Sequence, residues 1–208
     1  MPIRFFSLDK LVIIIISLYS GVVMAVSEPK YTVESKTENY EIRLYGATIV
    51  AETVVEADFD KAGNEAFRIL ADYIFGNNKS KIKIDMTAPV AQQPVSEKIA
   101  MTAPVNQIKD PRGQLVQFVM PDNFTMQTLP EPNDARVQLR LIGPRAVAVY
   151  TYSGSWSESR YKSKLAEFTA ELLKNNVNTQ GEPIFARFNS PFQIWFLRRN
   201  EIWIEVKR

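Results

Sequence analysis

The sequence contains no histidine and no cysteine among its 208 residues. Without histidine, the chain cannot form His-based metal sites or the Ser-His-Asp and Cys-His systems that activate nucleophiles in many hydrolases. Without cysteine, it has no disulfides, no thiolate chemistry and no lipoprotein-type lipid attachment. Acid–base chemistry is therefore left to carboxylate, lysine and tyrosine side chains, and no carboxylate pair stands at a spacing typical of a catalytic site.

Glycine and net charge are also scarce. The eight glycines are scattered singly along the chain, so there is no glycine-rich phosphate-binding loop. The formal net charge is only +2, whereas nucleic-acid binding requires a concentrated basic surface. The basic residues Lys79, Lys81 and Lys83 alternate along the chain, as on the solvent-facing side of a strand. We therefore expect no nucleic-acid partner.

One long apolar run is present, and it lies at the N-terminus. Leu11–Met24 is almost entirely apolar, follows two basic residues, and ends in Val23-Met24-Ala25, which suits signal peptidase. The run is shorter than the roughly 20 residues that a membrane-spanning helix needs. We therefore expect residues 1–25 to be a cleaved secretory signal peptide and 26–208 to form one periplasmic or secreted domain. The alternative is an uncleaved N-terminal membrane anchor.

The sequence Met-Thr-Ala-Pro-Val occurs twice, at residues 86–90 and 101–105. Apolar residues alternate with polar ones before the first copy, and Ile99 and Met101 repeat the pattern before the second. Each run then meets a proline, which has no backbone N–H to give to a neighbouring strand. The pattern predicts two short strands that end at the prolines and bring Met86 and Met101 to a common apolar face.

A second distinctive motif, Arg198-Arg199-Asn200-Glu201-Ile202-Trp203, lies near the C-terminus. Together, and in this order, the motifs resemble those of the SOUL (haem-binding protein) family, over roughly Tyr31–Val206. The resemblance implies an α+β fold, a distorted antiparallel β-barrel flanked by two helices. It also implies two pseudo-symmetric halves, about 31–105 and 113–208, and a tetrapyrrole ligand, haem or porphyrin, as reported for some members.

The rest of the chain fits this outline. β-branched and aromatic residues predict strands, and apolar residues spaced three or four apart predict helices. One helix is expected from Phe59 to Phe75 and another, opened by a capping box of Ser155 and Glu158, to Lys174. Strands are expected at residues 31–35, 40–45, 47–55, 115–120, 137–142, 146–152, 184–188, 193–197 and 202–206.

The two halves can be aligned with each other directly. Ala47–Asn78 and Arg145–Asn176 have equal length and align without a gap, as strand, helix and then two asparagines. Identity within the alignment is low. Together with the family resemblance, it predicts an internal duplication in which each half covers one sheet face with a helix.

Met86 and Met101 have two interpretations. Methionine often fills irregular gaps in a hydrophobic core. The alternative is that both thioethers line an apolar cleft and contact a flat ring or its metal. The usual axial ligands of haem iron, histidine and cysteine, are missing from the chain. The metal ligation of any bound haem is therefore left unknown.

Arginines and aromatics near the C-terminus are further candidates for ligand contact. Arg198 and Arg199 follow aromatic residues that include Trp195, and one guanidinium fits a ligand carboxylate such as a propionate. The simpler interpretation is a solvated turn in which Glu201 neutralises one arginine. In some members of the family that the chain resembles, the first helix is proposed to hold haem through methionine and basic residues. That contact set is not present here, and of this helix only Phe67 remains a candidate ligand contact.

The sequence favours a carrier or buffer that binds a tetrapyrrole or a similar flat apolar ligand, more than an enzyme. Two alternatives stay open. One is a small-molecule hydrolase that uses a carboxylate or tyrosine on the same fold, and the other is an envelope interaction module without a small ligand. A membrane is an expected partner only if the N-terminal segment is retained. The oligomeric state and the protein partners do not follow from the sequence.

Processing of the N-terminus can be tested directly. We expect cleavage after Ala25, which leaves a chain that begins at Val26, because the apolar run and the residues before the cut suit signal peptidase. N-terminal sequencing of the protein from the cell-envelope fraction provides the measurement. An intact Met1 on membrane-bound protein would favour the anchor instead.

Overall fold

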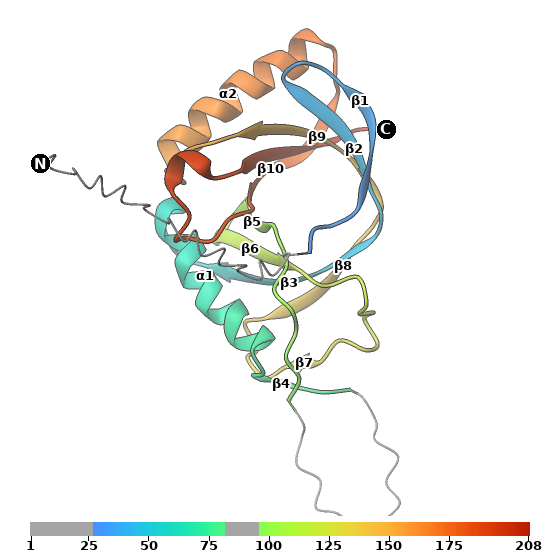
Figure 1. Cartoon of the computed structure of the whole chain (residues 1–208), viewed down its shortest axis with the longest axis vertical. Coiled ribbons are helices and arrows are strands. Elements are labelled where there is room, and N and C mark those ends of the chain that lie inside the picture. Colours follow the sequence, from blue (N-terminus) through green and yellow to red (C-terminus); the bar gives the residue numbers. More distant parts are fainter. Residues whose placement is uncertain (1–26, 82–95) are drawn as a thin grey trace, which may run out of the picture.

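The computed structural model describes residues 27–81 and 96–208. They form an α+β fold in which two helices accompany a nine-stranded antiparallel sheet (Figure 1). Neither helix in these ranges is long and apolar enough to cross a membrane. In chain order, the elements are β1 (Tyr31–Lys36), β2 (Tyr40–Tyr45), β3 (Thr48–Val55), α1 (Phe59–Ile74), β4 (Asn78–Lys79), β5 (Val105–Asp110), β6 (Gly113–Val119), β7 (Glu131–Pro132), β8 (Gln138–Ile142), β9 (Arg145–Tyr152), α2 (Glu158–Lys174), β10 (Thr179–Arg187), a short 3₁₀ helix η1 (Trp195–Leu197) and β11 (Asn200–Val206).

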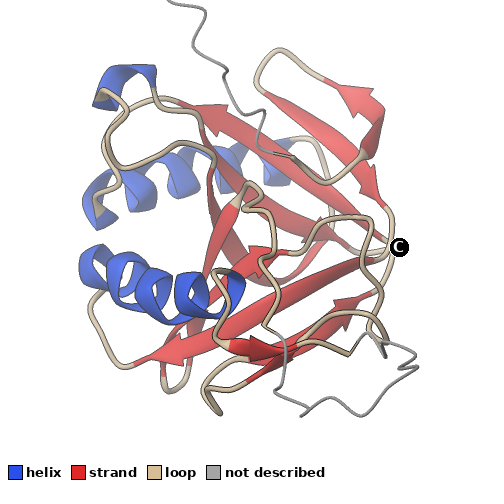
Figure 2. Cartoon of the chain, turned by 60° about the horizontal axis from the view of Figure 1, so that its bottom comes forward, coloured by secondary structure: helices blue, strands red, loops and turns tan. Residues whose placement is uncertain are grey.

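The large sheet has the strand order β1-β2-β9-β11-β10-β5-β6-β3-β8, and β4 and β7 form a separate two-stranded sheet. The large sheet is strongly curved, and both long helices lie on the same side of it (Figure 2). Within the described ranges, the end strands β1 and β8 do not pair with each other. The α+β prediction is confirmed, and the predicted barrel takes an open form. At the β1 edge, a bulge shifts the register between Val33 and Ser35.

The two halves of the chain exchange strands. β2 of the first half pairs with β9 of the second, and β8 of the second half pairs with β3 of the first. The gap-free alignment of the halves places β3 on β9 and, continued toward the N-terminus, β2 on β8. The same pairing therefore occurs twice, each time between halves. Both strand–helix units that the alignment predicts are present, and neither half contains the whole sheet.

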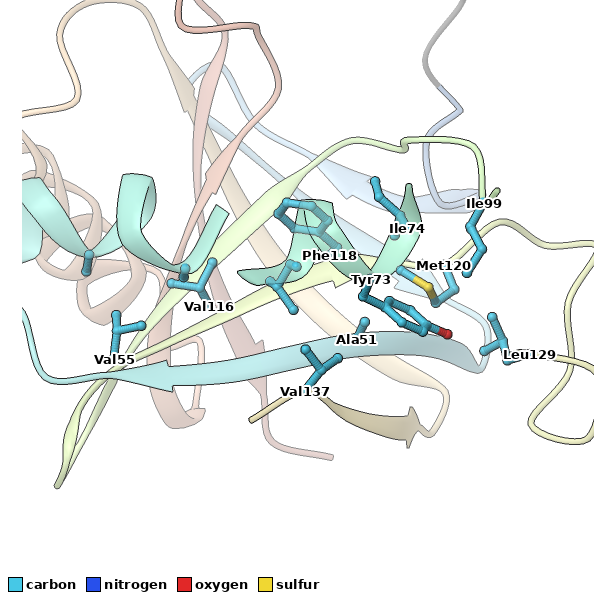
Figure 3. Packing of buried hydrophobic residues seen from close by; sticks show 13 residues of the cluster. Ala51, Val55, Tyr73, Ile74, Ile99, Val116, Phe118, Met120, Leu129 and Val137 are labelled. Carbon is cyan, nitrogen blue, oxygen red and sulfur yellow. The ribbon is translucent and has the colours of Figure 1, made fainter. Parts of the chain in front are cut away.

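Helix α1 packs on β3 and β6 through its apolar stripe. Ala62, Ala66, Leu70 and Ile74 are buried, as their spacing predicts. They meet buried residues of the two strands, and the ring of Tyr73 lies in the same cluster (Figure 3). The Tyr73 hydroxyl donates to the carbonyl of Pro130 at 2.9 Å, and burial raises its pKa. Since a large buried apolar side chain stabilises by about 1.5–3 kcal/mol, this cluster holds α1 in place.

Helix α2 packs on β10 and β11, where Phe168 and Leu172 are buried within a second cluster. The predicted capping box of Ser155 and Glu158 does not form. Helix α2 begins at Glu158, so the N-cap residue is Ser157, and its side chain makes no capping hydrogen bond. Instead, the Glu158 backbone N–H donates to the carboxylate of Asp60 at 2.7 Å. Asp60 lies in the first turn of α1, so a carboxylate of α1 accepts a hydrogen bond from a backbone N–H group that has no partner within α2.

The second Met-Thr-Ala-Pro-Val copy differs from its prediction. Ile99–Met101 forms no strand, and only an isolated bridge joins Thr102 to Ser27 before regular pairing begins with β5. Pro104 therefore stands directly before a strand and does not end one. A proline is tolerated at that position, since it removes no hydrogen bond from the ladder. The Thr102 hydroxyl donates to the carbonyl of Val119, which supports a structural role for the threonine. The first copy lies outside the described residues.

The predicted strand over residues 193–197 is also wrong. Its second part is the 3₁₀ helix η1. The N–H groups of Leu197 and Arg198 donate to the carbonyls of Ile194 and Trp195, at 3.0 and 3.3 Å. Because these hydrogen bonds close within the segment, its backbone does not pair with a neighbouring strand.

On the sheet face away from the helices, a charged cluster surrounds Glu201, which is fully buried. Its carboxylate accepts hydrogen bonds from Arg43 Nη1 at 3.1 Å, Arg199 Nε at 3.1 Å and Trp203 Nε1 at 2.6 Å. Burial alone would lower the pKa of Arg43, but the charge of Glu201 and the neighbouring hydrogen bonds raise it above its usual value. A buried carboxylate is tolerated only when it is paired and hydrogen-bonded, and this one is.

Replacement of this carboxylate tests the cluster. We expect Glu201→Gln to lower the free energy of unfolding by about 3–5 kcal/mol, because the buried Arg43 keeps Glu41 but loses its fully buried counter-charge. Urea melts provide the measurement. Glu34→Gln removes an ion pair with Arg208 at the surface and serves as the matched control. Equal urea midpoints for the two variants would show that the buried charge is not needed for stability.

Candidate functional site

A small groove opens beside α1, where the helix meets the ends of β5 and β10. Its cavity measures about 70 Å³. α1 contributes Gly63, Asn64 and Phe67 to the lining. The other lining residues come from β5, β10 and two loops of the second half: Val105, Trp156, Arg187, Asn189 and Pro191.

Strand geometry places Arg187 in this groove. Arg187 is the last residue of β10 and lies opposite Val105 of β5. Side chains alternate along a strand, so Arg187 faces the same way as Phe185, which packs in the cluster beneath α2. On α1, Gly63 leaves room for the guanidinium, because a Cβ at that position would lie 2.2 Å from both terminal nitrogens. The groove therefore depends on glycine at position 63.

The Arg187 guanidinium has no counter-charge within the described part of the chain. It forms no ion pair there, and its buried Nε has no hydrogen-bond partner. Removal from water lowers the pKa of Arg187 to about 10. The rings of Trp156 and Phe185 lie 5.2 and 5.8 Å from its Cζ and offset part of that cost. A carboxylate would complete this site with charge-assisted hydrogen bonds.

Trp156 forms one wall of the groove, and hydrogen bonds fix its indole in place. Its Nε1 donates to Asn200 Oδ1 at 2.8 Å, and Asn200 in turn donates to the carbonyl of Gly154 at 3.1 Å. Arg198 lies on the same indole, with Cζ 4.1 Å from the ring centroid. Two guanidinium groups therefore contact one aromatic ring.

Both arginines of the C-terminal motif form hydrogen bonds or ion pairs with other parts of the protein. Arg198 donates from Nε to the carbonyl of Gln193 at 2.9 Å and from Nη2 to that of Pro191 at 2.8 Å. Arg199 binds Glu201 and forms a two-pronged ion pair with Glu28 at 3.0 and 3.1 Å. Neither is available as a free ligand clamp in this arrangement, whereas Arg187 is.

The other predicted site residues do not lie together in the structure. Phe67 lines the groove and packs against Phe118, with 5.4 Å between ring centroids. Met101 is 37% exposed and does not line the groove. Trp195 lies on η1 and is also largely exposed. Met86 lies outside the described residues.

Sequence reasoning missed Arg187, Trp156 and Gly63 as a group. The residues are far apart in the chain, and none belongs to a recognisable motif. One signal was present for Arg187: in the run Ile184–Arg187, alternation places a charged side chain on the helix-covered face of a strand. Such a position is normally apolar, so an arginine there indicates a special environment.

Larger hollows lie elsewhere on the described surface. A larger hollow of about 460 Å³ lies beside the turn between β2 and β3, but its charged residues Lys30 and Asp122 pair with each other at 3.2 Å. In residues 27–81 and 96–208, no cluster of three or more acidic side chains could hold a metal ion.

Solved structures with a similar fold come from several classes of protein. The C-terminal domain of EcmrR has a TM-score of 0.57 at 11% identity, and the match covers 86% of this chain and 98% of that domain. A hydrolase from Listeria innocua has a TM-score of 0.52 at 12% identity, with 84% of this chain and 94% of that protein covered. At such low identity the likeness concerns the fold alone.

Sequence comparison is more specific. The chain is 29% identical to "Heme-binding protein 2" of Mus musculus over 187 residues, which cover 84% of this chain and 82% of that protein. It is 29% identical to "Heme-binding protein 2" of Homo sapiens over 181 residues, which cover 81% and 78%. The profile of the family described as "SOUL heme-binding protein" matches residues 26–205. With both motifs and the fold in agreement, the chain belongs to the SOUL heme-binding protein family.

Proposed function

We propose that the protein binds haem or a related tetrapyrrole at the groove beside α1, with a ring carboxylate held by Arg187. Family membership supports the ligand class. The observation that supports the place is the buried guanidinium of Arg187, which has neither an ion-pair partner nor a hydrogen-bond partner for Nε among the described residues. A propionate supplies both the missing charge and a planar acceptor pair.

The groove can accept a carboxylate group of this ligand but not its ring. Its 70 Å³ cavity is large enough for a carboxylate but not for a porphyrin ring. The ring therefore has to rest on the apolar surface around the opening, to which Phe67 and Trp156 contribute. Burial of on the order of 400 Å² of porphyrin gives roughly 10 kcal/mol before the costs of association. Lost rigid-body freedom reduces this value to an affinity on the order of micromolar.

The chemistry of the lining favours binding over turnover. Arg187 is the one ionisable side chain among the lining residues, so the groove offers no general base and no nucleophile. We therefore propose a carrier or buffer. The apolar N-terminal segment supports an exported protein, and we propose the cell envelope or the exterior as its location.

Substitution of Arg187 tests the proposed site. We expect Arg187→Met to weaken hemin binding about tenfold or more, since a hydrogen bond to a charged group is worth roughly 1.5–3 kcal/mol. The same change should leave the urea midpoint equal or higher, because it removes an unpaired buried charge. Binding titrations and urea melts on the same preparations measure the two effects.

The matched control is Arg112→Met, at an exposed arginine that pairs with Asp110 on the β5–β6 turn. This variant should bind hemin as the natural chain does. If Arg187→Met lowered stability and left the affinity per folded molecule unchanged, Arg187 would be a structural residue and the proposed site would be wrong.

The second prediction concerns the metal. The chain has no histidine or cysteine, and Met101 does not line the groove, so iron ligation should add little to the affinity. We expect metal-free protoporphyrin to bind within about tenfold of hemin, a difference of ~1.4 kcal/mol. Quenching of tryptophan fluorescence reports both ligands. A hemin preference of about a hundredfold, with a six-coordinate low-spin spectrum, would instead show a strong axial ligand.

A further inference from the structure

The loop of residues 191–197 between β10 and β11 exposes an unusual number of large apolar side chains. Soluble proteins rarely leave a contiguous apolar patch in water, and such a patch indicates an interaction site. Pro191, at the start of the loop, lines the groove, but none of the large exposed side chains does, so these side chains have no assigned role in the proposed ligand site. The exposed fractions are 96% for Phe192, 53% for Ile194, 56% for Trp195, 54% for Phe196 and 58% for Leu197.

Part of the backbone of this loop is satisfied from within. Arg198 Nη2 and Nε donate to the carbonyls of Pro191 and Gln193. The N–H groups of Gln193 and Leu197 donate to the carbonyls of Ser190 and Ile194, both at 3.0 Å. Polar backbone groups thus bond within the loop while the apolar side chains are exposed. A segment that enters lipid needs this arrangement, because acyl chains offer no hydrogen bonds.

The composition of the loop also suits a lipid surface. Asn189–Arg199 contains two arginines and no acidic residue, and the neighbouring Glu28 is paired with Arg199, so the loop presents no unpaired negative charge to anionic headgroups. Tryptophan and phenylalanine are typical of the membrane–water interface, where a ring can lie between headgroups and acyl chains. A protein-binding patch would more typically have a polar rim around its apolar centre.

The described part of the chain starts beside the same loop. Arg199, which follows the loop directly, holds Glu28 through its two-pronged ion pair. The first residues that the structure describes therefore lie next to the exposed apolar loop.

From these observations we infer that the 191–197 loop docks onto an anionic lipid bilayer and inserts Phe192, Trp195 and their apolar neighbours into its interfacial region. The inference does not rest on the proposed function, because it involves neither Arg187 nor a tetrapyrrole. The partner is the bilayer itself. A second copy of this chain or the chain's own N-terminal segment, seated on the loop, would contradict it.

The absence of cysteine allows a site-specific test on the full chain. Phe192→Cys carries an environment-sensitive fluorophore at the loop, and Leu173→Cys carries it at another exposed apolar position. Leu173 lies in the last turn of α2, on the order of 24 Å along the helix from its N-terminus. Vesicles of phosphatidylcholine with about a quarter phosphatidylglycerol are then added without any tetrapyrrole.

We expect the emission of the Phe192 probe to shift to the blue and to be quenched by brominated acyl chains, while the Leu173 probe stays unchanged. Adding Ile194→Gln, Trp195→Gln and Leu197→Gln to the Phe192→Cys chain should raise the lipid concentration for half-maximal response about tenfold or more. The urea midpoint should move little, because more than half of each changed residue is exposed.

Several results would overturn the inference. One is a Phe192 probe that stays in a watery environment at saturating lipid, and another is an equal response of both probes. A probe that is already in an apolar environment without lipid would show that protein covers the loop. Dependence of that signal on protein concentration would identify a second copy, and independence would identify the chain's own N-terminal segment.

Discussion

The fold depends on the pairing of β3 and β9 across the two halves of the chain. β3, of the first half, lies between β6 and β8 of the second, and β9 lies between β11 of its own half and β2 of the first. A strand in the middle of a sheet must satisfy its backbone hydrogen bonds on both sides. Neither junction strand can do so until both halves are present, so the sheet forms as a unit. Each of these strands leads directly into a helix, and α1 and α2 lie on the same side of the sheet (Figure 2).

Two buried charged residues show opposite solutions to the same electrostatic problem. Glu201 is fully enclosed, but two guanidinium groups and an indole N–H surround its carboxylate. Its burial is compatible with a stable fold because the charge is paired. Arg187 has aromatic rings for neighbours and no carboxylate within the described chain. An unpaired charge of this kind costs stability, and proteins tend to keep such groups at functional sites.

The sequence predicted the regular parts of this arrangement well. Both helices begin and end within one or two residues of their predicted bounds, because the apolar stripe of α1 and the inward side chains of α2 define one face each. The errors lie where long-range contacts decide. Asp60 of α1 replaces a local capping box at α2, and hydrogen bonds within the 191–197 loop replace a strand. No periodic pattern in the sequence predicts either contact.

The same contrast applies to the candidate site. The motif Arg198-Arg199-Asn200-Glu201-Ile202-Trp203 stands out in the sequence, yet its two arginines hold a loop and a buried carboxylate. Phe67 was predicted and lines the groove. Arg187 comes close to Gly63 and Trp156 only through the sheet and the helix packing, and a single sequence cannot show that proximity.

The open ends of the sheet have a consequence for self-association. An edge strand presents unpaired backbone groups on which the strand of another molecule can extend the sheet, which is the first step toward fibrils. At the β1 edge, the bulge between Val33 and Ser35 interrupts the regular ladder, and Glu34 forms an ion pair with Arg208 at the same point. An incoming strand would meet mismatched donors and acceptors there. The departure from a closed barrel is thus accompanied by a local irregularity that disfavours polymerisation from this edge.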